Sequence, residues 1–137
     1  MSQTTMPDAA QSAPMVLVIE DHPDTRAMYV EFLSMRFRVE QAASAVDGLD
    51  LAQRQPPDIV VTDLSLPGMD GFALIERMRQ DPVLHDVPAI CLSGYGGHAN
   101  EQRARSVGCQ LLLQKPCLPD DLAAHVDGVL RAARGHR

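Results

Sequence analysis

The sequence predicts an α/β fold in which helices cover both faces of a five-stranded parallel sheet. Short apolar segments alternate with segments of helical spacing five times along the chain. Such strict alternation favours parallel strands joined by crossover helices. The clearest apolar segments are continuous runs, which is typical of strands buried on both faces. With 137 residues, the chain has the usual length of one domain.

The predicted strands differ in strength. The first is a continuous apolar run that ends at an acidic pair, and the third is the clearest β-branched run. The second is short and mostly polar, so we expect it near an edge of the sheet. The five predicted strands occupy residues 15–19, 38–42, 59–62, 89–92 and 111–113.

The first predicted helix covers residues 23–36. Pro23 stands near its first turn, where proline is tolerated. Met28, Phe32 and Met35 recur at helical spacing, so we expect these three side chains to pack against the sheet.

The second predicted helix covers residues 44–54 and ends before a pair of prolines. Its expected core positions are Val46, Leu49 and Leu51. The remaining helices are expected around residues 72–80, at 98–107 and at 119–134.

The composition is that of an ordinary globular protein and argues against several functions. Hydrophobic residues make up 45% of the chain and charged residues 22%. A net charge of −6 argues against direct nucleic-acid binding, which requires basic surface. The sequence shows neither a secretory signal nor an apolar run of membrane-spanning length. We therefore expect a cytoplasmic protein without membrane insertion.

The cysteines Cys91, Cys109 and Cys117 are odd in number and lack the spacing of a zinc site. They are therefore expected to be reduced, buried thiols. Residues 1–14 are small and polar and are expected to form a disordered leader. The domain is predicted over residues 15–134, followed by a tail at 135–137 and no DNA-binding output module.

Polar side chains follow four of the predicted strands. In open α/β sheets, ligands bind in the crevice outside the carboxyl ends of the strands. Taken singly, each of these residues could cap a helix, lie in a turn or be a solvated surface residue. Their convergence at one edge of the sheet is what predicts a site. The residues are Glu20 and Asp21 after the first strand, Asp63 after the third, Ser93 after the fourth and Lys115 after the fifth.

The expected site combines three carboxylates with one ammonium and one hydroxyl group. Neighbouring carboxylates repel each other unless positive charge intervenes. Lys115 supplies one positive charge, and all-oxygen ligands favour Mg²⁺ as a second source. Phosphoryl transfer needs mainly positioning and charge neutralisation. We therefore predict that Asp63 is a phosphate-accepting nucleophile and that Ser93 and Lys115 contact the phosphoryl oxygens.

Several motifs surround these residues. The most specific is the segment Asp-Leu-Ser-Leu-Pro-Gly-Met-Asp-Gly, which begins at Asp63 and ends at Gly71. An acidic pair follows an apolar strand, Leu-Ser-Gly-Tyr surrounds Ser93, and Gln-Lys-Pro surrounds Lys115. From about residue 15 to about residue 134, the chain resembles a response-regulator receiver domain of bacterial two-component signalling.

This resemblance implies a flavodoxin-like, doubly wound three-layer fold with strand order 2-1-3-4-5. It implies that Asp63 accepts a phosphoryl group from a histidine kinase or a histidine phosphotransfer protein. Asp21 and Asp63 would hold Mg²⁺ directly, Glu20 would hold it through water, and Ser65 would contribute its backbone carbonyl.

The resemblance also implies a cis peptide between Lys115 and Pro116 and a turn at Gly68, since glycine tolerates positive φ. One departure is Leu112, which stands where the family often has an aromatic residue that moves on phosphorylation. Tyr95 is either a substitute for that residue or a surface side chain. Another departure is the small Cys117, where a bulkier apolar residue is frequent.

The predicted function is a phospho-accepting switch that changes its docking surface for a downstream protein partner. It would be no enzyme beyond assisting its own phosphoryl transfer and dephosphorylation. The alternative is a docking module that works without phosphorylation; Leu112 is compatible with it, whereas Asp63, Ser93 and Lys115 weigh against it. An FMN-binding protein is disfavoured because the loop after the first strand is acidic rather than rich in serine, threonine and glycine.

Overall fold

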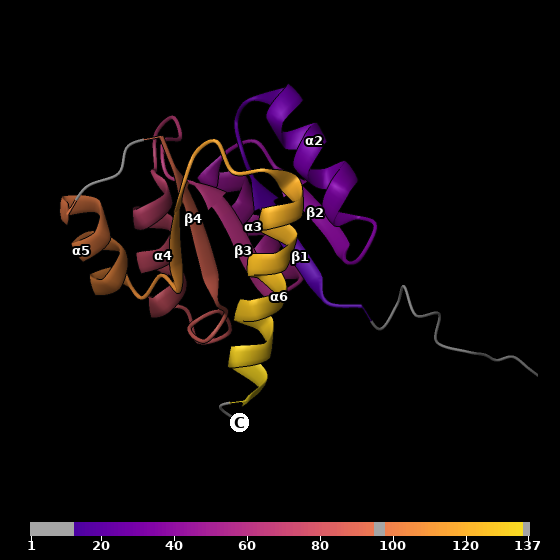
Figure 1. Cartoon of the computed structure of the whole chain (residues 1–137). Coiled ribbons are helices and arrows are strands. Elements are labelled where there is room, and N and C mark those ends of the chain that lie inside the picture. The colour runs from indigo at the N-terminus through magenta and orange to yellow at the C-terminus, as the bar shows by residue number, and fades with distance from the viewer. Residues whose placement is uncertain (1–12, 95–97, 136–137) are drawn as a thin grey trace, which may run out of the picture.

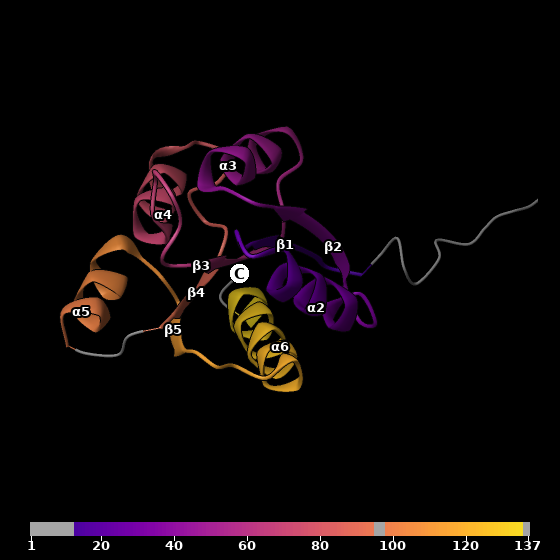
Figure 2. The ribbon, with the colours of Figure 1, turned by 90° about the horizontal axis from the view of Figure 1, so that it is seen from above.

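The computed structural model describes residues 13–94 and 98–135, which form a five-stranded parallel sheet between two layers of helices (Figure 1). The strand order is β2-β1-β3-β4-β5, which confirms the predicted doubly wound topology. Helices α2 and α6 cover one face, and α3, α4 and α5 cover the other (Figure 2). The strands are β1 (Met15–Ile19), β2 (Arg38–Ala42), β3 (Ile59–Asp63), β4 (Ala89–Ser93) and β5 (Leu111–Gln114). The helices are α2 (Pro23–Leu33), α3 (Ala45–Arg54), α4 (Gly71–Gln80), α5 (His98–Val107) and α6 (Pro119–Gly135).

The strand order reverses between β1 and β3. The chain runs outward from β1 to β2, returns to β3 on the other side of β1, and then continues outward to β4 and β5. Ligands of open α/β sheets bind at such a reversal, outside the carboxyl ends of the strands. Glu20 directly follows β1 and Asp63 is the last residue of β3, so both lie at this reversal, at the carboxyl ends of the strands.

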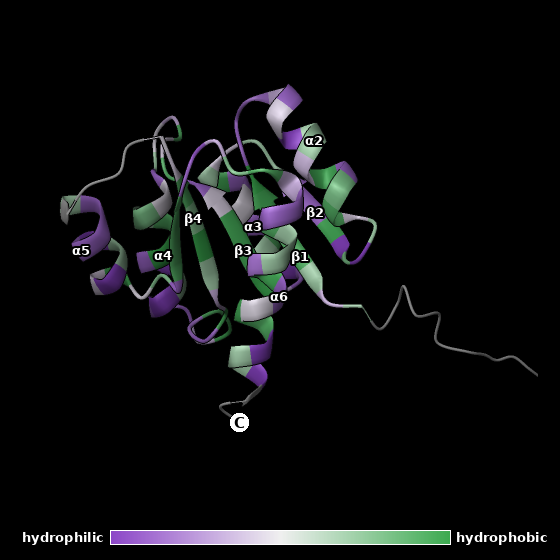
Figure 3. Ribbon diagram, viewed as in Figure 1, coloured by the Kyte–Doolittle hydropathy of each residue, from purple (hydrophilic) through white to green (hydrophobic). Residues whose placement is uncertain are grey.

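The continuous apolar runs form strands that are buried on both faces. All five residues of β1, β3 and β4 are buried, and Figure 3 shows the apolar colouring concentrated on these central strands. Leu17 and Ile19 of β1 pack toward α3, α4 and α5, whereas Val16 and Val18 pack toward α2 and α6. Full burial of a side chain of this size contributes about 2 kcal/mol. Two hydrophobic cores therefore hold the central strands, and with them the strand ends, in place.

The predicted packing face of the first helix is wrong. The buried side chains of α2 are Tyr29 and Leu33, and the helix ends at Leu33 rather than at residue 36. The Tyr29 hydroxyl donates a 3.0 Å hydrogen bond to the Cys117 carbonyl, which fixes the rotation of α2 against the segment before α6. The three residues expected in the core are instead exposed, by 38% for Met28, 40% for Phe32 and 76% for Met35.

The second helix matches its predicted core face only in part, because Leu49 and Leu51 are half-buried and pack against the core whereas Val46 does not. Val46 is 61% exposed, and the buried positions of α3 are small residues, including Gly48 and Ala52. A Cβ on Gly48 would lie 2.4 Å from Cδ1 of Ile19. Because α3 approaches β1 this closely, small residues and not large apolar ones occupy the contact.

Three strands extend one residue beyond their predicted ends, to Asp63, Ser93 and Gln114.

The predicted disordered leader lies outside the described residues at positions 1–12. Its last two residues contact β2, because the N–H and Nε of Arg38 donate to the carbonyls of Pro14 and Ala13 at 3.0 and 2.9 Å.

The longest described helix, α6, extends below the lower edge of the sheet in Figure 1. It includes Gly135, which the sequence had placed in the tail, whereas residues 136–137 lie outside the described part. No helix in the described ranges is long and apolar enough to cross a membrane.

Candidate functional site

The carboxyl ends of four strands bring the predicted site residues to one edge of the sheet. Glu20 and Asp21 follow β1, Asp63 ends β3, Ser93 ends β4, and Lys115 follows β5. The sheet pairing continues to this edge, because the Lys115 N–H donates to the Ser93 carbonyl at 2.7 Å. The backbone positions of these residues are therefore set by the strands rather than by long loops.

Lys115 bridges two buried carboxylates. Its Nζ lies 3.1 Å from Oε1 of Glu20 and 3.2 Å from Oδ2 of Asp63. Glu20 and Asp63 are 1% and 4% exposed, so little water screens the pair. Burial alone would lower the pKa of Lys115, but the hydrogen bonds to the two carboxylates raise it. The Lys115 side chain is therefore held in its charged form between the ends of β1 and β3.

Glu20 is held in its charged form. Burial alone would raise its pKa, but donation from the His22 N–H at 3.1 Å and from Lys115 lowers the pKa below its usual value. The Arg26 guanidinium donates to the Glu20 carbonyl at 2.8 Å and ties this backbone to α2. Glu20 is therefore a fixed negative charge.

Asp63 has the opposite shift. Burial and the negative charge of Glu20 raise its pKa, although Lys115 and the Ser65 N–H partly oppose this. The charged form of Asp63 is therefore less stabilised than the charged form of Glu20, the other partner of Lys115. A further positive charge nearby would stabilise it most.

The acidic residues fit a hard divalent cation. Glu20, Asp21 and His22 each offer a ligand atom within 4.8 Å of the others. Within the described residues, Oδ1 of Asp21 is buried without a hydrogen-bond partner. His22 Nδ1 lies 3.4 Å from it.

The charge balance also favours a cation. Three carboxylates and one ammonium leave two negative charges, which one Mg²⁺ would offset. Asp63 is not part of the compact group around Glu20 and contacts it through Lys115. Glu20 and Asp21 are thus the parts of the predicted ligand set that the structure brings closest together.

Two serines complete the predicted site. The Ser65 N–H lowers the pKa of Asp63, so this residue acts on the site through its amide. Its use of the backbone carbonyl as a metal ligand stays a prediction. Ser93 is 2% exposed and follows Leu92, the strand partner of Asp63. Tyr95 lies outside the described residues.

The backbone around the site has two features that the resemblance implied. Gly68 has φ +77°, a left-handed conformation that glycine adopts without steric cost. The peptide bond between Lys115 and Pro116 is cis. Both predictions are confirmed.

Sequence reasoning missed the roles of two residues. The His22 N–H and ring contact the acidic pair, and the position of His22 directly after that pair was the available signal. Gly71 lies against the backbone of Asp63, and a Cβ there would be 2.6 Å from the Asp63 carbonyl oxygen. Its fixed place at the end of the Asp63 motif was the signal.

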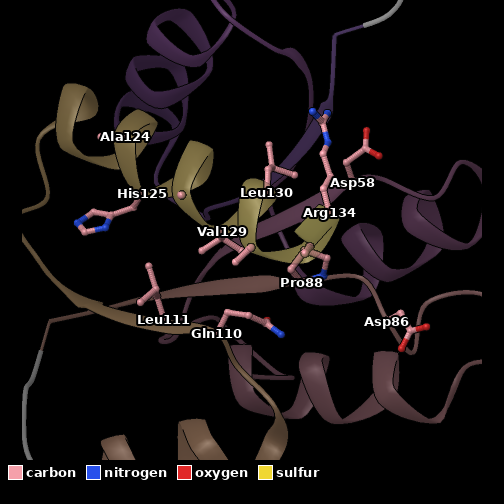
Figure 4. A pocket seen from close by; sticks show the side chains of 13 residues that line it. Asp58, Asp86, Pro88, Gln110, Leu111, Ala124, His125, Val129, Leu130 and Arg134 are labelled. Carbon is pink, nitrogen blue, oxygen red and sulfur yellow. The ribbon is translucent and has the colours of Figure 1, made fainter. Parts of the chain in front are cut away.

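A cavity of about 1000 Å³ lies at the opposite edge of the sheet, between α6 and the amino ends of β4 and β5 (Figure 4). Its charged side chains, among them Asp58, Asp86 and Arg134, are spread around its rim and do not converge on one point (Figure 4). The acidic site instead combines buried charge, an ammonium group and an unpaired carboxylate oxygen. Chemistry is therefore expected at the carboxyl edge.

The fold and the site define a small doubly wound α/β domain with a lysine-bridged acidic cluster at its switch point. Comparison with known families gives the same result, since residues 16–127 match the profile of the response regulator receiver domain. The chain belongs to this family, whose members are signalling modules of two-component systems and generally not enzymes.

Individual relatives agree with this assignment. The response regulator Rre1 of Synechocystis sp. is 31% identical over 84% of the chain, and the chain spans 51% of that protein. The sensor histidine kinase TmoS of Ectopseudomonas mendocina is 30% identical over 94% of the chain, which corresponds to 13% of TmoS. The solved structure of the chemotaxis protein CheY4 from Vibrio cholerae superposes with a TM-score of 0.82 at 26% identity, covering 85% of this chain and 98% of CheY4.

Proposed function

We propose that the chain is a phospho-accepting switch in which Asp63 receives a phosphoryl group from a phosphohistidine. The donor would be a histidine kinase or a histidine phosphotransfer protein. The observation that carries this proposal is the position of Lys115, whose Nζ lies 3.2 Å from Oδ2 of Asp63 and 3.1 Å from Oε1 of Glu20. A similar domain forms part of the kinase TmoS, which supports a partner of this kind.

In the proposed reaction, a carboxylate oxygen of Asp63 attacks phosphorus, and the bond from phosphorus to the histidine nitrogen breaks. The histidine leaves with the electron pair of that bond. The acyl phosphate that forms carries about −1.5 to −2 charges, so the site gains negative charge that its cations must offset. Lys115 would hold one phosphoryl oxygen, and the Ser93 hydroxyl would donate to another.

Mg²⁺, when bound, would neutralise charge on the transferring phosphoryl group. Glu20, Asp21 and Asp63 would hold it, with the Ser65 carbonyl as a further ligand. The buried and unpaired Oδ1 of Asp21 supports this role. These residues would also orient the carboxylate of Asp63 before transfer.

Phosphorylation would be read by a downstream protein partner through a shifted surface equilibrium. Leu112 is half-buried and packs against the core beneath α3, α4 and α5. It has no hydroxyl to follow Ser93, so the readout would not use an aromatic switch at this position. The alternative function, docking without phosphorylation, rests on this same residue.

The first test is phosphorylation by acetyl phosphate and Mg²⁺, followed by intact mass. The wild-type chain should gain one base-labile phosphoryl group, and Asp63→Asn should gain none. Asp86→Asn is a matched control, because Asp86 is 90% exposed and lies before β4 at the opposite edge. A phosphorylated Asp63→Asn variant, or an unmodified wild type, would contradict the proposal.

The second test separates the switch from the docking module. The partner captured by the phosphorylated chain should bind Asp63→Ala at least ten times more weakly, a difference of about 1.4 kcal/mol. Equal binding by wild type and Asp63→Ala would favour docking without phosphorylation.

A further inference from the structure

Two of the three cysteines, Cys91 and Cys109, lie in the same core, on the face of the sheet that α3, α4 and α5 cover. Cys91 is fully buried in β4, and Cys109 is half-buried directly before β5. Each of the two thiols shifts the pKa of the other. Both pack in the core beneath α3, α4 and α5. The expectation of buried thiols is thus correct for Cys91, whereas Cys109 and Cys117 are only half-buried.

The turn from α5 to β5 holds Cys109 in place. Gly108 has φ +82° and reverses the chain after the helix, and the Cys109 N–H donates to the Ala104 carbonyl at 2.8 Å. The Arg79 guanidinium donates to the Gly108 carbonyl at 2.8 Å and so ties the turn to α4. These contacts direct the Cys109 side chain toward the sheet.

The Cys109 sulfur lies between the backbones of two adjacent strands. Its Sγ is 3.5 Å from the Ala89 carbonyl of β4 and 2.9 Å from the Leu111 carbonyl of β5. Ala89 and Cys91 are two residues apart on β4, so their side chains share one face of the sheet. This geometry brings the Cys109 sulfur to the side of β4 on which the Cys91 thiol lies.

The two thiols differ in reactivity. The neighbouring Cys91 thiol, backbone N–H groups and the charge of Arg79 lower the pKa of Cys109, against the effect of burial. The contact with Cys109, together with burial, raises the pKa of Cys91. Since the thiolate is the reactive form, a half-exposed Cys109 is the sulfur that an external oxidant would meet first.

We propose that Cys91 and Cys109 form a reversible intramolecular disulfide when the chain meets a hydroperoxide. The Cys109 thiolate attacks the peroxide, whose O–O bond breaks, and yields a sulfenic acid with release of hydroxide or alkoxide. The Cys91 sulfur then attacks the Cys109 sulfur, and the S–O bond breaks. The Cys91 proton leaves with the departing hydroxide as water. A dithiol reductant restores both thiols.

The disulfide would join the turn before β5 to β4. Cys91 is the strand partner of Thr62 and lies two residues before Ser93. The link would therefore restrain the strand whose carboxyl end contributes to the Asp63 site, although the thiols take no part in phosphoryl transfer.

Cys117 provides an internal control. It is half-buried like Cys109, but it packs against the other core, beneath α2 and α6. Burial and the negative charge of Asp121 raise its pKa. Cys117 should therefore react more slowly and form no bond within the chain.

The experiment treats the full chain with hydrogen peroxide and measures intact mass before and after reduction with dithiothreitol. Wild type and Cys117→Ser should lose two hydrogen atoms and regain them on reduction. Cys109→Ser should not lose them. The variants are needed because trypsin does not cut between Lys115 and Pro116 and so leaves Cys109 and Cys117 on one peptide.

Other outcomes would overturn the proposal. These are gain of oxygen without loss of hydrogen in the wild type, a covalent dimer as the main product, or loss of two hydrogen atoms in Cys109→Ser. Cys91→Ala tests the second sulfur, and circular dichroism shows whether the variant folds. If it does not fold, alkylation of the oxidised wild type should leave Cys117 as the one modified cysteine.

Discussion

Gly71 lies directly against the backbone of Asp63, where a Cβ would be 2.6 Å from the Asp63 carbonyl oxygen. The Gly71 N–H donates to the Leu64 carbonyl at 2.9 Å, and the Asp70 side chain caps α4 by accepting from the Ala73 N–H at 2.8 Å. The start of α4 therefore closes onto the end of β3. This contact positions the residue proposed to accept phosphate.

Gly71→Ala should destabilise the fold and slow phosphorylation. The added methyl must displace backbone and not a flexible side chain, so we expect a loss of about 2 kcal/mol in the free energy of unfolding. Gly128→Ala is the control, because nothing lies within 4 Å of its Cβ position in α6. That change should stabilise by about 0.5–1 kcal/mol. Urea denaturation measures both, and equal effects would contradict the close contact.

Asp63→Asn should stabilise the protein in EDTA at pH 7. Burial and the charge of Glu20 raise the pKa of Asp63 in the folded state. The ordinary pKa of an aspartate in the unfolded chain is about 4. Above that pH, the folded state binds more protons than the unfolded state. This carboxyl therefore lowers the stability of the protein as the pH rises from the unfolded pKa to the folded pKa. Removing its charge should add about 1 kcal/mol to the free energy of unfolding.

The control for this prediction is Asp86→Asn. Because the Asp86 side chain is 90% exposed, this change should alter the free energy of unfolding by less than about 0.5 kcal/mol. Chemical denaturation at pH 7 provides the measurement. A less stable Asp63→Asn would mean that its attraction to Lys115 outweighs burial and repulsion from Glu20.

The sequence predicted the strands and the site because both depend on order along the chain. A continuous apolar run followed by a polar residue locates a strand end, and parallel topology then gathers Asp63, Ser93 and Lys115 at one edge. The bridging of Glu20 and Asp63 by Lys115 depends on burial and side-chain direction, which a single sequence does not specify. The raised pKa of Asp63 depends on the same burial.

The sequence did not predict which face of α2 and of α3 packs against the sheet, and the reason is a different one. In α2, Met28 and Phe32 have the same four-residue spacing as Tyr29 and Leu33, so periodicity allowed two faces. The hydrogen bond from Tyr29 to the Cys117 carbonyl selects one of them, and it joins residues 88 positions apart. In α3, the close approach of Gly48 to Ile19 excludes large side chains from the contact.

Tyr29→Phe should cost about 1 kcal/mol at pH 7, because the Cys117 carbonyl loses its donor. Burial and the negative charge of Cys117 raise the pKa of Tyr29. The wild-type contribution is therefore complete below about pH 10 and declines as pH rises further, because the unfolded phenol ionises first. The difference between the two proteins should shrink at about pH 11.

Met35→Ala is the comparison for Tyr29→Phe, since Met35 is 76% exposed and should change stability by less than about 0.5 kcal/mol. Urea denaturation at both pH values tests the pair. A difference between wild type and Tyr29→Phe that stays constant up to pH 11 would contradict the raised pKa.

Mg²⁺ should stabilise the wild-type chain through Asp21. A ligand at 100 times its dissociation constant adds about 2.7 kcal/mol to the free energy of unfolding. Asp21→Asn should lose most of this gain, because Oδ1 of Asp21 is buried and unpaired among the described side chains. Asp24→Asn should keep it, since Asp24 is an exposed residue in the first turn of α2. Thermal melts with MgCl₂, and with NaCl at equal ionic strength, separate a bound ion from general screening. A gain that NaCl reproduces, or that Asp21→Asn retains, would show that the acidic residues are screened rather than ligated.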